Sequence, residues 1–278
     1  MPFQELAQAA TTGAAAAEPA SGGAGFEIPH LAPDVLFQIG PLGITNTILF
    51  TYLVMVVLVA LAIICTRNLK LVPANRSWQT FAEVVIGTLL NLAEGSVGRE
   101  RARKIFPLMG TLFIFILTAN WLGLFPLVGP FYVLKEGGEK IDLFRSVNAD
   151  WSTTLALALI TFAVTEFWGL RMRAKEHLLH FILPLGVGQI ELVSEFVRVL
   201  SLSVRLFGNL FAGEVLVTVM TGLIPVVVPA VFLLLETLFG FIQATVFTVL
   251  CLAYFTLNTT SHHAEHEEAH SPAHAAAA

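Results

Sequence analysis

The chain has 278 residues, of which 56% are hydrophobic and 13% charged, whereas a soluble domain has about 25% charged residues. This composition excludes an ordinary soluble protein and predicts a membrane protein, because several apolar runs reach the roughly 20 residues that cross a bilayer. The net charge of −5 hides an uneven distribution: of 15 Lys and Arg residues, only Arg198 and Arg205 lie beyond residue 175.

Two polar tails flank a membrane domain that we expect over residues 44–260. Residues 1–43 are rich in Ala, Gly and Pro and contain neither Lys nor Arg. They lack the basic start and apolar core of a secretory signal, so we expect a poorly ordered, exported tail. Residues 261–278 carry five histidines. We interpret them as a solvated tail, with metal binding as the alternative that such tracts allow.

Three apolar spans are predicted before residue 175, at 44–65, 106–128 and 151–170. Between the first two, residues 78–94 are too polar to span but repeat apolar residues every three or four positions, which predicts an amphipathic helix on the cytoplasmic surface. A soluble helix packed on a partner protein is the alternative.

The two cysteines lie in apolar runs and indicate neither a disulfide framework nor a metal site.

Basic residues predict the orientation, because they collect on the cytoplasmic side of short loops. They cluster after the first span, before the second and after the third, whereas the loop 129–150 holds three basic and four acidic residues. This pattern places the N-terminus outside, residues 67–104 inside, the loop 129–150 outside and the C-terminus in the cytoplasm.

The apolar stretch 178–220 contains no polar loop. As one helix it would extend about 65 Å, roughly twice the hydrocarbon thickness. Either it breaks near Pro184, Gly186 and Gly188, or it is steeply tilted; we favour one tilted helix. After a break at Gly222 and Pro225, a final run continues to residue 257. The predicted fold is therefore an all-α, polytopic membrane protein. Five membrane helices are expected, with a surface amphipathic helix and a C-terminal hairpin of long tilted helices.

The hairpin concentrates the polar side chains of the apolar region. Glu191, Arg198 and Arg205 are spaced by seven residues and share one helix face, with Asn209 one turn further, while Glu214 lies about 180° from Arg205. Folding the two runs back at the break pairs Arg205 with Gln243 and Glu214 with Glu236.

An arginine in the middle of a membrane helix needs a compensating interaction, because its insertion costs about 2.5–3.5 kcal/mol or more. Ionisable residues at that depth commonly mark ion or proton pathways. The alternative is an internal ion pair of Arg205 with Glu195 or Glu191.

The segment "SLSVRLFGNLFAGE", residues 201–214, resembles the signature of subunit a of the F-type ATP synthase. The resemblance extends over roughly residues 34–258 and includes "FIFILTANWLGLFP" in the second span and "FGFIQATVFTVL" in the last. Two positions depart from many bacterial relatives: Glu236 stands where they have a histidine, and Arg198–Val199 stands where they have Lys-Pro.

This resemblance implies a membrane stator subunit of the CF(0) sector, in a bacterial plasma (inner) membrane. Its partners would be a rotating c-ring of small two-helix subunits, b-type peripheral stalk subunits and the lipid bilayer. Arg205 would face the ring carboxylate and separate two aqueous half-channels that carry protons to and from the ring. Asn209 and Gln243 would be polar neighbours of Arg205, and Glu214, Glu236 and Glu191 would lie along the half-channels.

The resemblance implies a non-catalytic, proton-translocating subunit without a cofactor. The chain has no G-x-x-x-x-G-K-[ST] phosphate loop, so we expect no direct nucleotide binding, and we expect no nucleic acid partner. The coupling ion is expected to be H⁺, with Na⁺ as the alternative. A secondary transporter or ion channel with a buried charged pathway is the alternative function, although the sequence lacks the repeated halves common in transporters.

Overall fold

The computed structural model describes the backbone of residues 35–39, 42–67, 69, 77–124, 132–134, 140–182, 187–224 and 227–259. Residues 1–34 and 260–278 lie outside this range, and with them most of the tail expected over 1–43 and all of the tail expected over 261–278. The elements are β1 Val35–Ile39, β2 Leu42–Thr45, α2 Asn46–Thr66, α3 Trp78–Val97, α4 Arg99–Gly123, β3 Tyr132–Leu134, β4 Lys140–Asp142, the 3-10 turn η1 Val147–Ala149, α5 Trp151–Ile182, α6 Val187–Leu223 and α7 Val227–Thr259.

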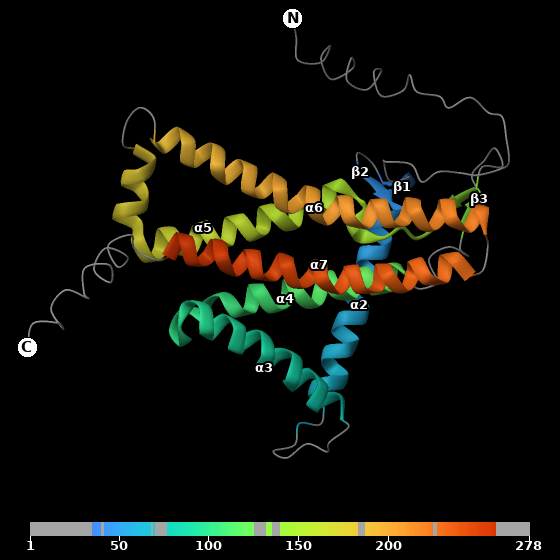
Figure 1. The fold of residues 1–278 in the computed structure, drawn as a ribbon, viewed down its shortest axis with the longest axis horizontal. Helices are drawn as coiled ribbons and strands as arrows, with labels where there is room; N and C mark the ends of the chain where they lie inside the picture. Colours follow the sequence, from blue (N-terminus) through green and yellow to red (C-terminus); the bar gives the residue numbers. More distant parts are fainter. Residues whose placement is uncertain are drawn as a thin grey trace, which may run out of the picture.

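Four helices, α4 to α7, lie side by side and form the main body of the protein, while α2 runs across them (Figure 1). α6 and α7 fold back on each other as a hairpin, and α7 also packs on α4 and α5. Within the described residues, five helices, α2 and α4 to α7, are long and apolar enough to cross a bilayer. The predicted all-α, polytopic membrane fold is therefore confirmed.

The lengths and directions of the helices explain the predicted tilt. α2 has 21 residues and extends about 31 Å, which matches the hydrocarbon thickness when it stands upright. α6 has 37 residues and extends about 55 Å, far more than an upright span needs. Because α2 crosses the direction of α6 and α7 (Figure 1), an upright α2 leaves both hairpin helices strongly inclined.

The long apolar stretch is divided differently from our prediction. The sequence prediction is one helix over 178–220, but α5 continues to Ile182 and a new helix begins at Val187. Pro184 and Gly186 lie between the two helices, outside the described residues. Proline lacks the backbone N–H of a helix interior and disfavours helical geometry in the residue before it. The alternative prediction, two helices separated near Pro184 and Gly186, therefore agrees with the structure, and α6 alone has 37 residues.

The bounds of the second span also differ from the prediction of 106–128. α4 begins at Arg99 and ends at Gly123, so the basic segment before the span is helical and Pro107 lies within the helix. The chain reverses between α3 and α4 at Gly98, whose φ of 79° is a left-handed conformation that glycine adopts without strain.

The predicted amphipathic helix exists as α3. Ser77 caps its start, accepting a hydrogen bond from the Thr80 amide at 3.3 Å, and Leu89 and Ala93 are buried against α4. Trp78 and Phe81, which share the apolar face, are 62% and 63% exposed. The first turns of α3 therefore leave an apolar surface available to lipid.

The core lies where α4, α6 and α7 meet. It contains Ile105, Met109 and Ile116 of α4, Leu206 of α6 and Phe247 of α7, all fully buried. α2 contributes a smaller cluster around Phe50 and Val54. The antiparallel hairpins β1–β2 and β3–β4 were not predicted.

Candidate functional site

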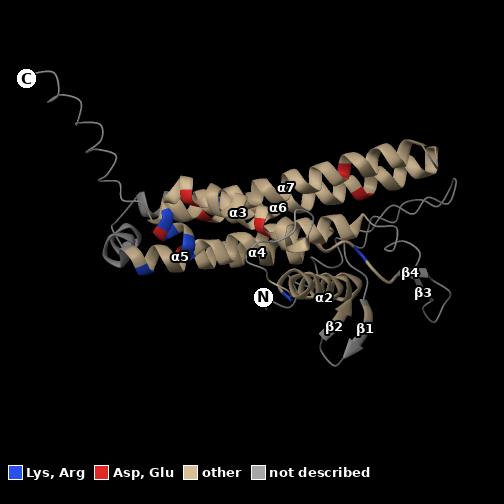
Figure 2. Cartoon of the chain, turned by 90° about the horizontal axis from the view of Figure 1, so that it is seen from below, with Lys and Arg blue, Asp and Glu red and all other residues tan. Residues whose placement is uncertain are grey.

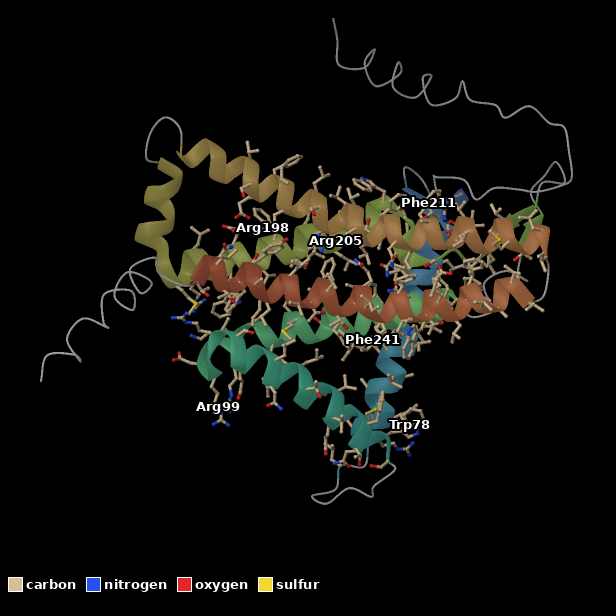
Figure 3. All side chains as sticks on the ribbon, viewed as in Figure 1. Trp78, Arg99, Arg198, Arg205, Phe211 and Phe241 are labelled. Carbon is tan, nitrogen blue, oxygen red and sulfur yellow. The ribbon has the colours of Figure 1, made fainter. Side chains whose placement is uncertain are left out.

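Arg205 lies midway along α6 with an exposed side chain (Figure 3). Among the residues that the structure describes, no hydrogen bond or ion pair of its guanidinium is found. The proposed internal partner Glu195 pairs instead with Arg198, so that part of the ion-pair alternative is wrong. The side chain of Glu191 lies outside the described residues. A cation on an apolar helix thus faces outward from this chain, where a second molecule can reach it.

The predicted hairpin register holds near the turn between α6 and α7. A Cβ atom added at Gly213 would lie 2.7 Å from the Cδ atom of Glu236, so these two positions face each other. Glu214 and Glu236 line one cavity. The structure therefore brings together the two carboxylates that the sequence paired, one from each helix of the hairpin.

Glu236 lies between two cavities. The first, of about 200 Å³, is lined by both carboxylates together with Asn120, Ser146 and Thr218. The second, of about 160 Å³, is lined by Glu236, Asn209 and Gly213 with apolar residues of α6 and α7. Both volumes are large enough for several water molecules, since one water needs roughly 10–15 Å³. Of the residues that line both cavities, Glu236 and Val217, only Glu236 can carry a proton between two sites that water can occupy.

Gln243 and Asn209 occupy different surroundings. Gln243 is buried, and its amide nitrogen has no hydrogen-bond partner within the described segments. Asn209 is half-buried at the second cavity. Among the contacts of the described residues, none joins Gln243 to Arg205, so that predicted pair stays a prediction. The two carboxylates, in contrast, line one cavity.

Sequence reasoning missed an amide network that joins three segments beside the first cavity. The Asn148 side chain of η1 donates to Asn120 Oδ1 at 2.6 Å, and Asn120 Nδ2 donates to the Gly240 carbonyl at 3.1 Å. Trp121 Nε1 donates to the Thr237 carbonyl at 3.3 Å. The only signal in the sequence was an asparagine inside an apolar span, which needs a partner when buried.

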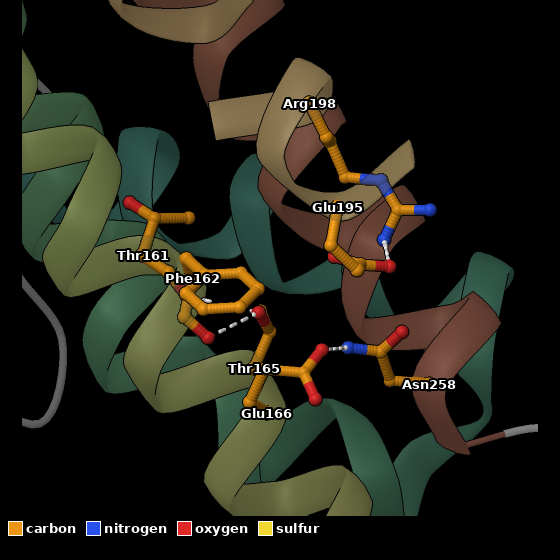
Figure 4. Close-up of polar contacts among 7 residues, drawn as sticks. All are labelled: Thr161, Phe162, Thr165, Glu166, Glu195, Arg198 and Asn258. Atoms are coloured by element: carbon orange, nitrogen blue, oxygen red, sulfur yellow. Dashed lines mark hydrogen bonds and ion pairs between the residues drawn. The ribbon is translucent and has the colours of Figure 1, made fainter. Parts of the chain in front are cut away.

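A second polar cluster was also missed, at the far end of the bundle from the α6–α7 turn. Here Glu195 pairs with Arg198, whose guanidinium lies 4.6 Å from the centre of the Tyr254 ring. Beside them, Asn258 Nδ2 donates to Glu166 Oε1 at 2.5 Å (Figure 4). Three helices, α5, α6 and α7, thus meet through charged and polar side chains at this end.

Comparison with known proteins gives a consistent result. Residues 48–256 match the family described as "ATP synthase A chain". "ATP synthase subunit a" of Gloeobacter violaceus is 36% identical over 226 residues, 81% of this chain and 88% of the relative. That of Moorella thermoacetica is 34% identical over 227 residues, 81% and 95% of the two chains. The chain therefore belongs to the family of ATP synthase subunit a.

Proposed function

We propose that this chain is the membrane stator of an F-type ATP synthase and passes protons to and from carboxylates on a rotating ring of small two-helix subunits. The observation that carries this proposal is the exposed Arg205, placed midway along an apolar helix and without an ion pair in the described part of the chain. A guanidinium stays protonated under physiological conditions, so its counter-charge is expected on the neighbouring ring.

Arg205 then acts as an electrostatic gate. An approaching ring carboxylate is stabilised in its ionised form by the cation and releases its proton. Once it has moved past Arg205 into apolar surroundings, the carboxylate favours its neutral form and takes up a proton. Protons therefore pass between the two sides only by way of the ring.

The outer half-channel is assigned to the first cavity and the two carboxylates. A proton entering the cavity that Glu214 and Glu236 line is transferred through Glu236 to the second cavity on the Asn209 side, and from there to the ring. In this assignment Glu236 takes the role of a proton relay, and Gln243 and Asn209 are its polar surroundings. Glu191 is assigned to the inner half-channel, on the other side of Arg205.

The charge distribution supports the orientation. A group of basic residues lies at the end of the bundle where α4 begins and α5 ends, opposite the α6–α7 turn (Figure 2). This end is assigned to the cytoplasm of a bacterium, with the N-terminus outside and the C-terminus inside. The chain itself is non-catalytic: nucleotide chemistry belongs to other subunits, and b-type stalk subunits hold the chain against the ring.

The test is Arg205→Ala in the whole complex, reconstituted in liposomes. Proton-driven ATP synthesis should be abolished while the ring still co-purifies in mild detergent. Arg205→Lys should also lose most of its activity, because an ammonium does not reproduce the planar guanidinium. Arg99→Ala is the matched control, since its side chain is 76% exposed in a surface ion pair. Near-normal synthesis by Arg205→Ala would refute the gate, and failure to recover any ring would refute the stator.

A further inference from the structure

α6 carries two arginines with very different surroundings. Arg198 and Arg205 are seven residues apart, which places them about 10 Å apart along the helix and within about 20° of the same face. Arg205 is exposed, whereas the Arg198 side chain is 17% exposed. The helix therefore holds two permanent cations on nearly the same face, one of them exposed and the other largely covered.

Two groups cover Arg198. Glu195, one turn earlier on α6 and itself 12% exposed in its side chain, forms an ion pair with its guanidinium. The Tyr254 ring of α7 lies under the same group, 4.6 Å away, at a distance typical of a cation–π interaction. Glu195 and Tyr254 therefore cover the Arg198 guanidinium from α6 and from α7.

We propose that Glu195 masks the charge of Arg198, so that α6 presents a single accessible cation, Arg205, to the mobile carboxylates of the ring. This inference rests on the proposed function. An unmasked Arg198 would offer a second binding site to a carboxylate that leaves Arg205 toward the inner end. Because a guanidinium does not lose its proton, that second site would hold the carboxylate ionised where it should exchange a proton with the inner side.

Two other roles for the Glu195–Arg198 pair make different predictions. A purely structural clamp would require both partners, because breaking a buried pair from either side leaves an uncompensated or missing contact. If Glu195 itself carried protons, ATP synthesis would require its carboxylate whichever residue occupies position 198. If Glu195 masks Arg198, ATP synthesis requires Glu195 as long as Arg198 is present and no longer requires it once Arg198 is replaced.

The experiment therefore compares Glu195→Gln, Arg198→Gln and the double variant in the intact complex, with proton-driven ATP synthesis in liposomes as the measurement. Glu195→Gln should lower synthesis about tenfold, which corresponds to holding a carboxylate about 1.4 kcal/mol more tightly. Arg198→Gln should retain synthesis within about threefold, and the double variant should recover to that level, as a coupled pair predicts. Glu100→Gln, which breaks an exposed pair with Lys104, is the matched control and should change nothing.

Rescue of Glu195→Gln by Arg198→Gln supports masking. Equal losses in both single variants, without rescue in the double variant, overturn masking in favour of a clamp. An active Arg198→Gln combined with a double variant as poor as Glu195→Gln overturns masking in favour of a proton carrier. If Glu195→Gln does not assemble, Arg198→Gln and the double variant still decide. Masking requires both to be active, a clamp predicts a loss in Arg198→Gln, and a proton carrier predicts a loss in the double variant. If Arg205→Ala abolishes synthesis while Glu195→Gln is normal, this inference fails and the proposed function stands.

Discussion

Replacing Gly213 by alanine should impair proton transfer without weakening the fold. Gly213 of α6 faces the Glu236 side chain of α7, and a Cβ atom at 213 would lie 2.7 Å from its Cδ and 3.3 Å from its Cγ. Ordinary contacts between carbon atoms are about 3.5–4.0 Å. The carboxylate must therefore retreat by about 1 Å, and it can do so because it is the end of a flexible side chain.

The size of the effect follows from that displacement. A misplacement of about 1 Å at a reacting group can lower a rate about 100-fold, so a loss of this order is expected in proton flux through the outer half-channel. Stability should not fall, because alanine is favoured over glycine in a helix interior by about 1 kcal/mol.

The control is Gly208→Ala on the same helix, where an added Cβ atom meets nothing within 4 Å. Both variants gain the same helix propensity, so their difference isolates the contact with Glu236. The assays are ATP-driven acidification of inverted membrane vesicles and the yield of assembled complex. Equal proton flux in the two variants would refute the assignment of Glu236 as a relay positioned by Gly213.

Three further predictions test the hairpin and its surroundings. Gly240→Ala should destabilise the assembled subunit in a thermal-unfolding assay, because its Cβ would lie 3.0 Å from the Cβ of Asn120, an atom fixed to the α4 backbone; a stability equal to the parent would contradict the close packing. Glu236→Gln should slow proton flux appreciably, Glu236→His should be tolerated, and the loss of both Glu214 and Glu236 should be far worse than either loss; a double variant no worse than a single one would argue against a relay. Glu214→Cys with Glu236→Cys should cross-link, since a disulfide needs Cα atoms within about 7 Å, whereas Thr218→Cys with Glu236→Cys should cross-link poorly; similar yields would contradict the register.

Hydropathy and helix periodicity predicted the elements that are decided locally. The five spans and the surface helix follow from runs of apolar residues. The pairing of Glu214 with Glu236 follows because a tight fold-back fixes which residues lie opposite each other close to the turn. The preference for one helix over 178–220 was wrong, because hydropathy measures only how apolar a stretch is. Pro184 interrupts a helix through its backbone and leaves the mean hydropathy of the stretch almost unchanged.

The contacts that sequence reasoning missed are long-range ones. Asn120 bonds to Gly240, 120 positions away, and Glu166 bonds to Asn258, 92 positions away. Periodicity within one helix says which face a residue occupies but not which helix will cover it. Glu195 is a different case, because its partner Arg198 lies one turn away on the same helix and helix periodicity allows that pair. Only the position of the Arg198 guanidinium over the Tyr254 ring of α7 depends on how the helices pack.

The bond from Asn120 to the Gly240 carbonyl has a mechanical consequence. In the proposed complex, each step of the ring pushes sideways on α6 and α7, and the enzyme yields torque only if this wall does not slide. The hydrophobic effect that holds α7 on α4 is non-directional and does not by itself fix the register of the two helices. The Asn120 side chain donates a hydrogen bond to the α7 backbone at Gly240. It also accepts one from Asn148 of η1, which fixes its orientation. In the proposed complex, these directional hydrogen bonds oppose sliding of α7 along α4, so that α6 and α7 can resist the lateral force of the turning ring.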